Sequence, residues 1–226
     1  MMLVAALGAA FALFAWRAPQ MKSGGLFAPI SREGGLLLNN LLLAAGCGAV
    51  FVGTLYPLFL EAFGGGKISV GPPFYNATFV PLMIPLVLAM AVGPLLSWKR
   101  ADLGGALGRL VFAALAAVAI GAASQAYMPD GPVTGASLAD ADPLAGLARA
   151  METGGAALGL ALAAWLVFGA LIEFAERIKL FRISPWASLR RAAGLPRAAY
   201  GMTLAHGGLG IAIVGMIGST VWQTED

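Results

Sequence analysis

The stretch that decides the fold is LLLNNLLLAAGCGAVFVGTLYPLFL, residues 36–60, which contains no acidic or basic side chain. A helix of about 20 apolar residues is long enough to cross the ~30 Å hydrocarbon core of a bilayer. The run shows neither the strict alternation nor the closely spaced turns that are typical of barrel strands. Because backbone polar groups in lipid must bond within their own segment, it predicts a transmembrane α-helix.

The composition of the whole chain supports a membrane protein. Of 226 residues, 59% are hydrophobic and only 11% are charged, whereas soluble domains carry about 25% charged residues. So few charged side chains cannot cover a solvated surface, which excludes a soluble globular enzyme. The net charge is +3, but no basic patch interleaved with aromatic residues indicates a nucleic-acid partner. A single cysteine, Cys47, excludes a disulfide framework and a CxxCH site for covalent haem attachment.

Five further apolar runs lie along the chain, so we expect an all-α, polytopic membrane protein with six transmembrane helices. Residues 1–226 then form a single membrane domain. The expected spans are residues 1–16, 36–60, 77–98, 106–123, 153–172 and 198–221. The first run is short for a span and lacks the basic leading region of a signal peptide. We expect it to be the remainder of a helix in a larger protein.

Basic residues predict the orientation, because cytoplasmic connections of membrane proteins are enriched in Lys and Arg. In this chain 12 of the 14 basic residues lie in or beside the first, third and fifth connections. They are Arg17, Lys22, Arg32, Lys99, Arg100, Arg109, Arg177, Lys179, Arg182, Arg190, Arg191 and Arg197. Only Lys67 and Arg149 fall in the second and fourth connections. We therefore expect both chain ends outside the cytoplasm.

The connecting segments carry local signals. Glycines at 64–66 allow left-handed backbone in the second connection, and the following stretch 67–76 contains a rigid double proline at 72–73. In the fourth connection, residues 129–132 predict a turn, and Pro143 predicts the start of a short interfacial helix. The periodicity of residues 173–181 predicts that the fifth helix continues beyond the bilayer.

His206 is the strongest candidate for chemistry, because ionisable groups at membrane depth are costly. It lies eight residues beyond Ala198, about 12 Å into the sixth span at 1.5 Å per residue. Two interpretations remain open: a histidine hydrogen-bonded to a neighbouring helix without a cofactor, or an axial ligand of haem iron. Gly207 and Gly210 would allow either a helix or a flat macrocycle to approach closely.

The haem interpretation needs a second axial ligand, and this chain has one histidine. Met202 lies one turn earlier on the same helical face, so it cannot reach the opposite side of the haem. The second ligand must then come from outside this chain or be water.

Four stretches together resemble one family. They are LNNLLL at 38–43, GTLYP at 53–57, KISVGPPFYN at 67–76 and LAHG at 204–207. With the hydrophobic pattern around them, they resemble the cytochrome c biogenesis proteins of the CcmF/NrfE haem lyase family over essentially the whole chain. The resemblance implies the central-to-C-terminal portion of such a protein, without the family's tryptophan-rich haem-handling segment.

The resemblance implies a function in cytochrome c maturation. The family takes haem from the chaperone CcmE and attaches it to apocytochrome c, which a CcmH-type protein presents at the periplasmic face of the bacterial inner membrane. It also holds an intramembrane b-type haem, and His206 matches one of its axial histidines. Haem b, CcmE, a CcmH-type protein, apocytochrome c, membrane lipid and the missing N-terminal part are thus the expected cofactor and partners.

Several questions stay open from the sequence. Enzymatic activity is uncertain, and we expect the chain to be inactive as a lyase by itself. The alternatives are a solute permease subunit that uses the kinked third helix, and a purely structural membrane subunit without a cofactor. The sequence does not distinguish a natural split subunit from a truncated gene or a partial gene model, and it leaves the oligomeric state and the role of residues 67–76 open.

Overall fold

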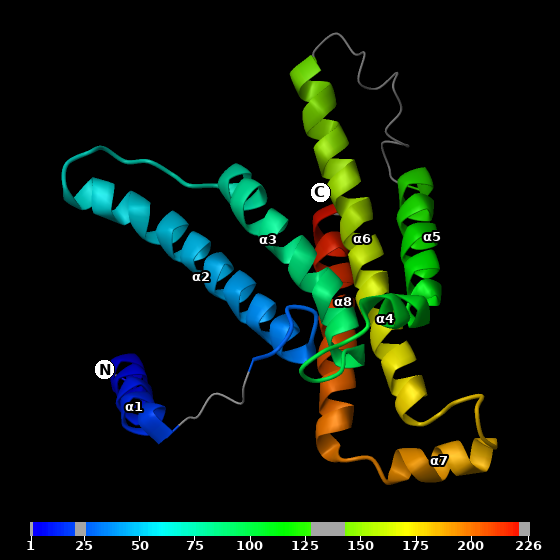
Figure 1. The fold of residues 1–226 in the computed structure, drawn as a ribbon. Coiled ribbons are helices and arrows are strands. Elements are labelled where there is room, and N and C mark those ends of the chain that lie inside the picture. The colour runs from blue at the N-terminus through cyan, green and yellow to red at the C-terminus, as the bar shows by residue number, and fades with distance from the viewer. Residues whose placement is uncertain (1, 21–25, 128–142, 222–226) are drawn as a thin grey trace.

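A computed structural model describes residues 2–20, 26–127 and 143–221, and the regular structure within these ranges is helical (Figure 1). The elements are α1 (Met2–Arg17), η1 (Ala18–Gln20), α2 (Arg32–Ala62), α3 (Pro72–Val92), η2 (Gly93–Leu95), α4 (Leu103–Arg109), α5 (Val111–Tyr127), α6 (Pro143–Arg177), α7 (Pro185–Ala193) and α8 (Arg197–Val221). The predicted all-α class is confirmed for these residues.

Four of the described helices are long and apolar enough to cross a membrane. They are Arg32–Ala62, Phe74–Leu95, Gly154–Arg177 and Arg197–Ser219. Helices α4 and α5, bent by 57° at their junction, would form a fifth span if they act as one. The first expected span corresponds to α1, whose 16 residues are few for a crossing. A polytopic membrane protein is thereby supported, while six spans remain a prediction.

The expected span at 106–123 differs from the structure, which breaks the helix at Leu110. The physical reason is Arg109, which is costly in lipid. Its guanidinium donates to Glu176 at 3.0 Å and to the carbonyl of Leu95 at 3.3 Å. The bend at Leu110 thus places α4 beside the polar groups that satisfy Arg109.

The longest helix, α6, is at the centre of the packing. It lies between α5 and α8 and also contacts α3 (Figure 1). The core around it is built largely from alanines, with Leu110 and Trp165 as its largest members. Trp165 Nε1 donates to the carbonyl of Leu88 at 3.2 Å, which ties α6 to α3. Small side chains allow close helix approach, and a Cβ on Gly169 would lie 2.6 Å from the Cβ of Ala91 on α3.

Helices α2 and α3 form a hairpin that leans away from α6 (Figure 1). The start of α2 is fixed to the segment after η2 by three backbone hydrogen bonds. They run from Ala28 N to Lys99 O at 2.8 Å, from Arg32 N to Ser97 O at 3.0 Å, and from Ala101 N to Ile30 O at 2.9 Å. These bonds hold the start of α2 and the segment after η2 together at the base of the hairpin.

The expectations for the connections are met in part. Gly64 and Gly66 have φ values of +76° and +84°, so the predicted left-handed backbone is confirmed there. A helix does begin at Pro143, but it continues without a break to Arg177 instead of forming a separate interfacial element. The continuation expected at 173–181 is helical only as far as Arg177. The turn expected at 129–132 lies outside the described residues.

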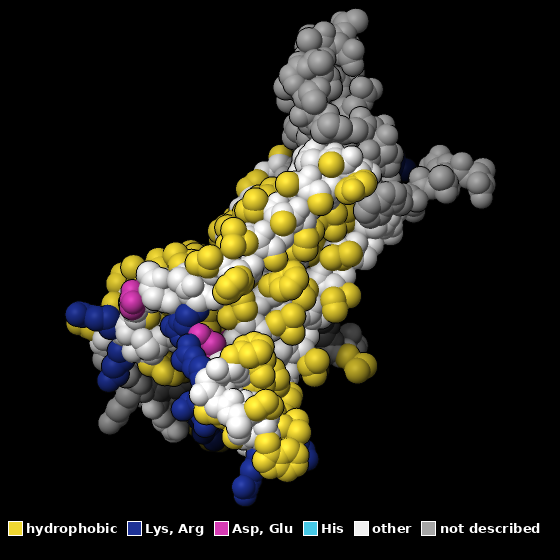
Figure 2. All heavy atoms as spheres, turned by 90° about the vertical axis from the view of Figure 1, so that its right-hand side faces the viewer, with side chains coloured by type: hydrophobic (Ala, Val, Ile, Leu, Met, Phe, Trp, Pro, Cys, Tyr) yellow, Lys and Arg dark blue, Asp and Glu magenta, His cyan; other side chains and the backbone are white. Residues whose placement is uncertain are grey.

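One end of the molecule gathers charge. Figure 2 shows Lys and Arg side chains mostly at one end of the visible face, with hydrophobic side chains covering the rest of its described surface. At this end Glu176 lies 3.0 Å from Arg109 and 3.9 Å from Arg182. The short helix α7, which the sequence did not predict, also lies here (Figure 1). Arg191 on α7 donates to the carbonyl of Arg177 at 2.9 Å, which joins α7 to the end of α6.

Candidate functional site

His206 is half-buried on α8, where it forms part of the wall of a cleft. The cleft has a volume of about 230 Å³ and lies between α8, the first turns of α2, and the junction of α3 with η2. Apolar groups dominate its lining: Leu36, Ala89, Met90, Pro94 and Met202. Polar atoms come from Arg32, Asn39 and His206. An apolar cleft with few polar groups is the usual character of a cofactor site.

The two glycines expected near a cofactor differ in their surroundings. A Cβ on Gly207 would meet no described atom within 4 Å, and Gly207 is not among the residues that line the cleft. At Gly210 a Cβ would lie 2.6 Å from Cγ2 of Val167 and 2.9 Å from the carbonyl oxygen of Ala163. The close approach expected at Gly210 is therefore made by α6, because the helix already occupies that space.

Arg32 gives the cleft a positive charge. Its side chain is half-buried, and its guanidinium carbon lies 5.2 Å from the ring centre of Trp98. Within the described part of the chain it forms no ion pair with a carboxylate. An unpaired guanidinium beside an apolar wall is suited to an amphiphilic ligand that carries acidic groups.

His206 is the one imidazole that lines the cleft. Among the described residues, no three His, Cys, Asp or Glu side chains come close enough to hold a metal ion. A single imidazole beside an apolar wall fits an axial position on a macrocycle that supplies the other iron ligands itself. At about 230 Å³ the cleft is smaller than pockets that enclose a drug-sized ligand, roughly 300–1,000 Å³. A macrocycle bound at His206 would therefore be only partly enclosed by the described residues.

Glu173 is the residue that sequence reasoning missed. The sequence predicts a span that ends at residue 172, and His206 is therefore the only ionisable group that it places at membrane depth. In the structure Glu173 is 4% exposed and lines a second, narrow space that also contains His206. Its Oε1 accepts a hydrogen bond from Arg177 Nε. The sequence signal was the Glu–Arg spacing of one helical turn, which is typical of a paired charge.

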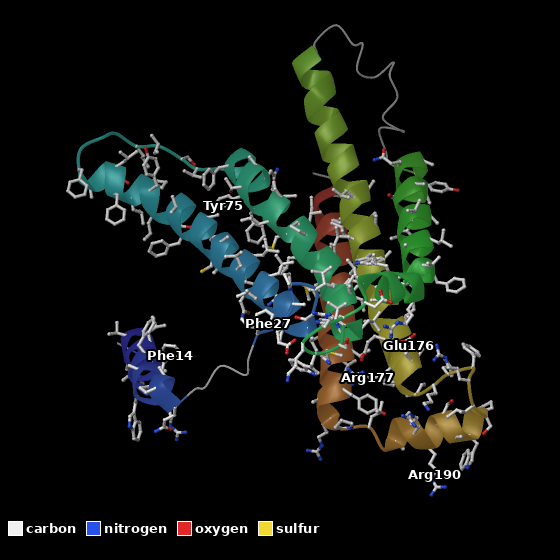
Figure 3. All side chains as sticks on the ribbon, viewed as in Figure 1. Phe14, Phe27, Tyr75, Glu176, Arg177 and Arg190 are labelled. Carbon is white, nitrogen blue, oxygen red and sulfur yellow. The ribbon has the colours of Figure 1, made fainter. Side chains whose placement is uncertain are left out.

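Two of the sequence stretches meet at the other end of the α2–α3 hairpin. A Cβ on Gly53 would lie 2.6 Å from Cε1 of Phe74 and 3.0 Å from the hydroxyl of Tyr75. Figure 3 shows Tyr75 near the start of α3, on the side of α2. Gly53 is 14 residues from the cleft residue Asn39, or about 21 Å along the helix. The structure thus joins residues 53–57 to 67–76 but places both far from His206.

These features define a class: a multi-pass helical membrane protein with a histidine, on one of its candidate spans, in the wall of an apolar cleft. Comparison with known proteins identifies the family, although no family model and no solved structure matches the chain. It is 44% identical to the cytochrome c-type biogenesis protein CycK of Rhizobium meliloti (strain 1021), over 99% of this chain and 30% of that protein. It is 35% identical to CcmF of Pseudomonas aeruginosa and 31% identical to CcmF of Escherichia coli K12, again over 99% of this chain and 30% of each relative.

The chain belongs to the CcmF family of cytochrome c-type biogenesis proteins, as its sequence motifs predicted. It spans about 30% of the length of these curated relatives.

Proposed function

We propose that this chain is part of a haem lyase of cytochrome c maturation and supplies His206 as one axial ligand of an intramembrane b-type haem. The observation that carries the proposal is the position of His206 in the wall of an apolar cleft that also contains Arg32. These relatives are named as cytochrome c-type biogenesis proteins, and their names support a function in cytochrome c maturation.

Each residue of the cleft has a separate task in this proposal. His206 presents a neutral imidazole nitrogen to the iron, and the apolar wall keeps water from it. Arg32 offers its guanidinium to the propionate carboxylates. The bound haem would supply one-electron transfer, by which the haem being attached to apocytochrome c is kept reduced.

The chain would form one wall of the site and the remaining family architecture the other. His206 is the only histidine of the sequence, so the second axial ligand would come from outside this chain or be water. CcmE as haem donor, and a CcmH-type protein that presents apocytochrome c, would act on the assembled protein. The chain itself is then a lyase component and not a complete enzyme.

The proposed location is the bacterial inner membrane, with six spans and both chain ends in the periplasm. The gathering of Lys and Arg side chains at one end of the molecule supports this orientation (Figure 2). A solute permease or a purely structural subunit would need no haem ligand. The cytochrome c-type biogenesis relatives favour the haem hypothesis over both.

Reduced-minus-oxidised absorption spectra test the proposal. The protein is purified from membranes together with the portion of the CcmF architecture that this chain does not cover. We expect a b-type signal that His206→Ala abolishes. Met202→Leu is the matched control, because it changes another cleft side chain on the same helical face at nearly constant volume. An undiminished signal in the His206→Ala protein would refute the assignment.

A further inference from the structure

Glu173 has one carboxylate oxygen without a hydrogen-bond partner. Oε1 accepts from Arg177, but Oε2 is buried and unpartnered among the described residues. The space beside it is too narrow to hold a water molecule. A buried oxygen without a donor loses the free energy of its hydration. An unpaired carboxylate oxygen on a candidate membrane span is therefore a candidate for a functional hydrogen bond.

Among the residues that line this space, a single side chain is a candidate for the donor. Ala91, Pro94, Gly169 and Ala170 have no side-chain donor, and the methionines Met90 and Met202 have none either. The hydroxyl of Thr203 already donates to the carbonyl of Ala199 at 3.1 Å. The imidazole of His206 remains, and the structure gives its ring nitrogens no hydrogen bond within the described residues.

The register of α6 and α8 brings the two side chains to the same level. The helices run in opposite directions, and Arg177 Nη2 lies 4.0 Å from the sulfur of Met202. Glu173 is one turn from Arg177 along α6, and His206 is one turn from Met202 along α8. Both turns lead into the membrane, so they end at the same depth, about 6 Å further in. Close packing of Gly210 against Val167 holds this register.

We propose that Glu173 is a positioning residue for His206: its Oε2 accepts a hydrogen bond from one ring nitrogen of the imidazole, which leaves the other nitrogen directed toward the cleft. The hydrogen bond from Arg177 occupies its first oxygen. A carboxylate behind a metal-bound histidine fixes the tautomer and raises the basicity of the ligand. The role at the iron rests on the function proposed above, whereas the contact between Glu173 and His206 does not.

The haem readout uses the assembled protein described above with Glu173→Gln, which keeps the size of the side chain and removes its charge. Because a less basic imidazole stabilises ferric iron less, the midpoint potential of the His206-dependent haem rises. Haem retention falls by about tenfold or more. Glu176→Gln is the matched control, since Glu176 lies on the same helix but pairs with Arg109, and it leaves both quantities unchanged. A Glu173→Gln protein with the potential and haem retention of this control would overturn the role at the iron.

The second readout needs no haem. Thermal unfolding of wild type, Glu173→Met, His206→Ala and the double variant forms a cycle that measures coupling between the two side chains. We expect shifts in Tm that are clearly not additive, and additive shifts in the equivalent cycle of Glu176→Met with His206→Ala. Additive shifts at Glu173 would overturn the contact itself. If no b-type signal exists, the function proposed above fails, and this cycle still decides whether Glu173 positions His206.

Discussion

Two glutamates one turn apart on α6 are satisfied in different ways. Glu176 has a side chain 25% exposed and lies between Arg109 and Arg182 at the charged end of the molecule. Glu173 is 4% exposed and has one oxygen without a partner. Figure 3 shows Glu176 and Arg177 at the lower end of the α6–α8 pair. Single residues therefore decide where the charged surface ends and the apolar interior begins.

Glu176→Gln should have only a small effect on stability. Arg109 and Glu176 remain 40% and 25% exposed, so water and salt screen their attraction. We expect the free energy of unfolding to fall by less than about 1 kcal/mol, and the difference to shrink further at high salt. Denaturant titration in detergent at two salt concentrations measures this. A salt-independent loss of several times that size would show that the pair holds α4 against α6 more strongly than its exposure indicates.

At the scale of elements, sequence reasoning was most successful where one apolar run makes one helix. Residues 36–60 and 198–221 lie in α2 and α8 because membrane-spanning helices depend mainly on their own composition. The break at Leu110 could not be predicted, because it depends on Glu176, 67 residues after Arg109. Helix α7 was missed because it is short and polar on one side, so no apolar run marks it.

The site shows the same division between local and distant information. His206 could be found because an ionisable residue inside an apolar run is visible in the sequence. Its relation to Glu173 could not, because it depends on the register of two helices packed through Gly210 and Val167. The cleft that Arg32 and His206 share could not be predicted either, because it forms only where α2 lies next to α8, and no local sequence pattern encodes that placement.

Packing of the α2–α3 hairpin can be tested at Gly53. A Cβ there would lie 2.6 Å from the ring of Phe74, so Gly53→Ala forces the aromatic side chains to move. We expect destabilisation by about 1–3 kcal/mol, the usual cost of overpacking. Gly48→Ala on the same helix is the control, because a Cβ there meets no described atom within 4 Å. Thermal unfolding in detergent compares the two, and equal Tm values would contradict the close contact between α2 and α3.

At the scale of the whole molecule, charge and apolar surface are segregated. In the most apolar stretch of α2, only 6% of the residues are buried inside the protein, and the fraction is the same for α8. Such exposure of apolar side chains is stable in lipid and not in water. The concentration of Arg and Lys at one end then gives the molecule a direction across the bilayer (Figure 2).

Cysteine labelling in intact cells tests this direction. In a Cys47→Ser background, Lys67→Cys should react with a thiol reagent that reaches the periplasm but does not cross the inner membrane. Arg182→Cys should react only after the cells are broken. Both positions are exposed, so accessibility alone does not separate them. The reverse pattern would invert the proposed topology.

The three backbone hydrogen bonds at the base of the hairpin have a mechanical consequence. They tie the beginning of α2 to the segment after η2, so Arg32 moves together with Ser97 and its neighbours. Gly169 and Ala91 form a tight contact that anchors α3 on α6. A larger ligand in the cleft would therefore displace the start of α2 and the segment after η2 together, so that Arg32 keeps its place relative to Ser97.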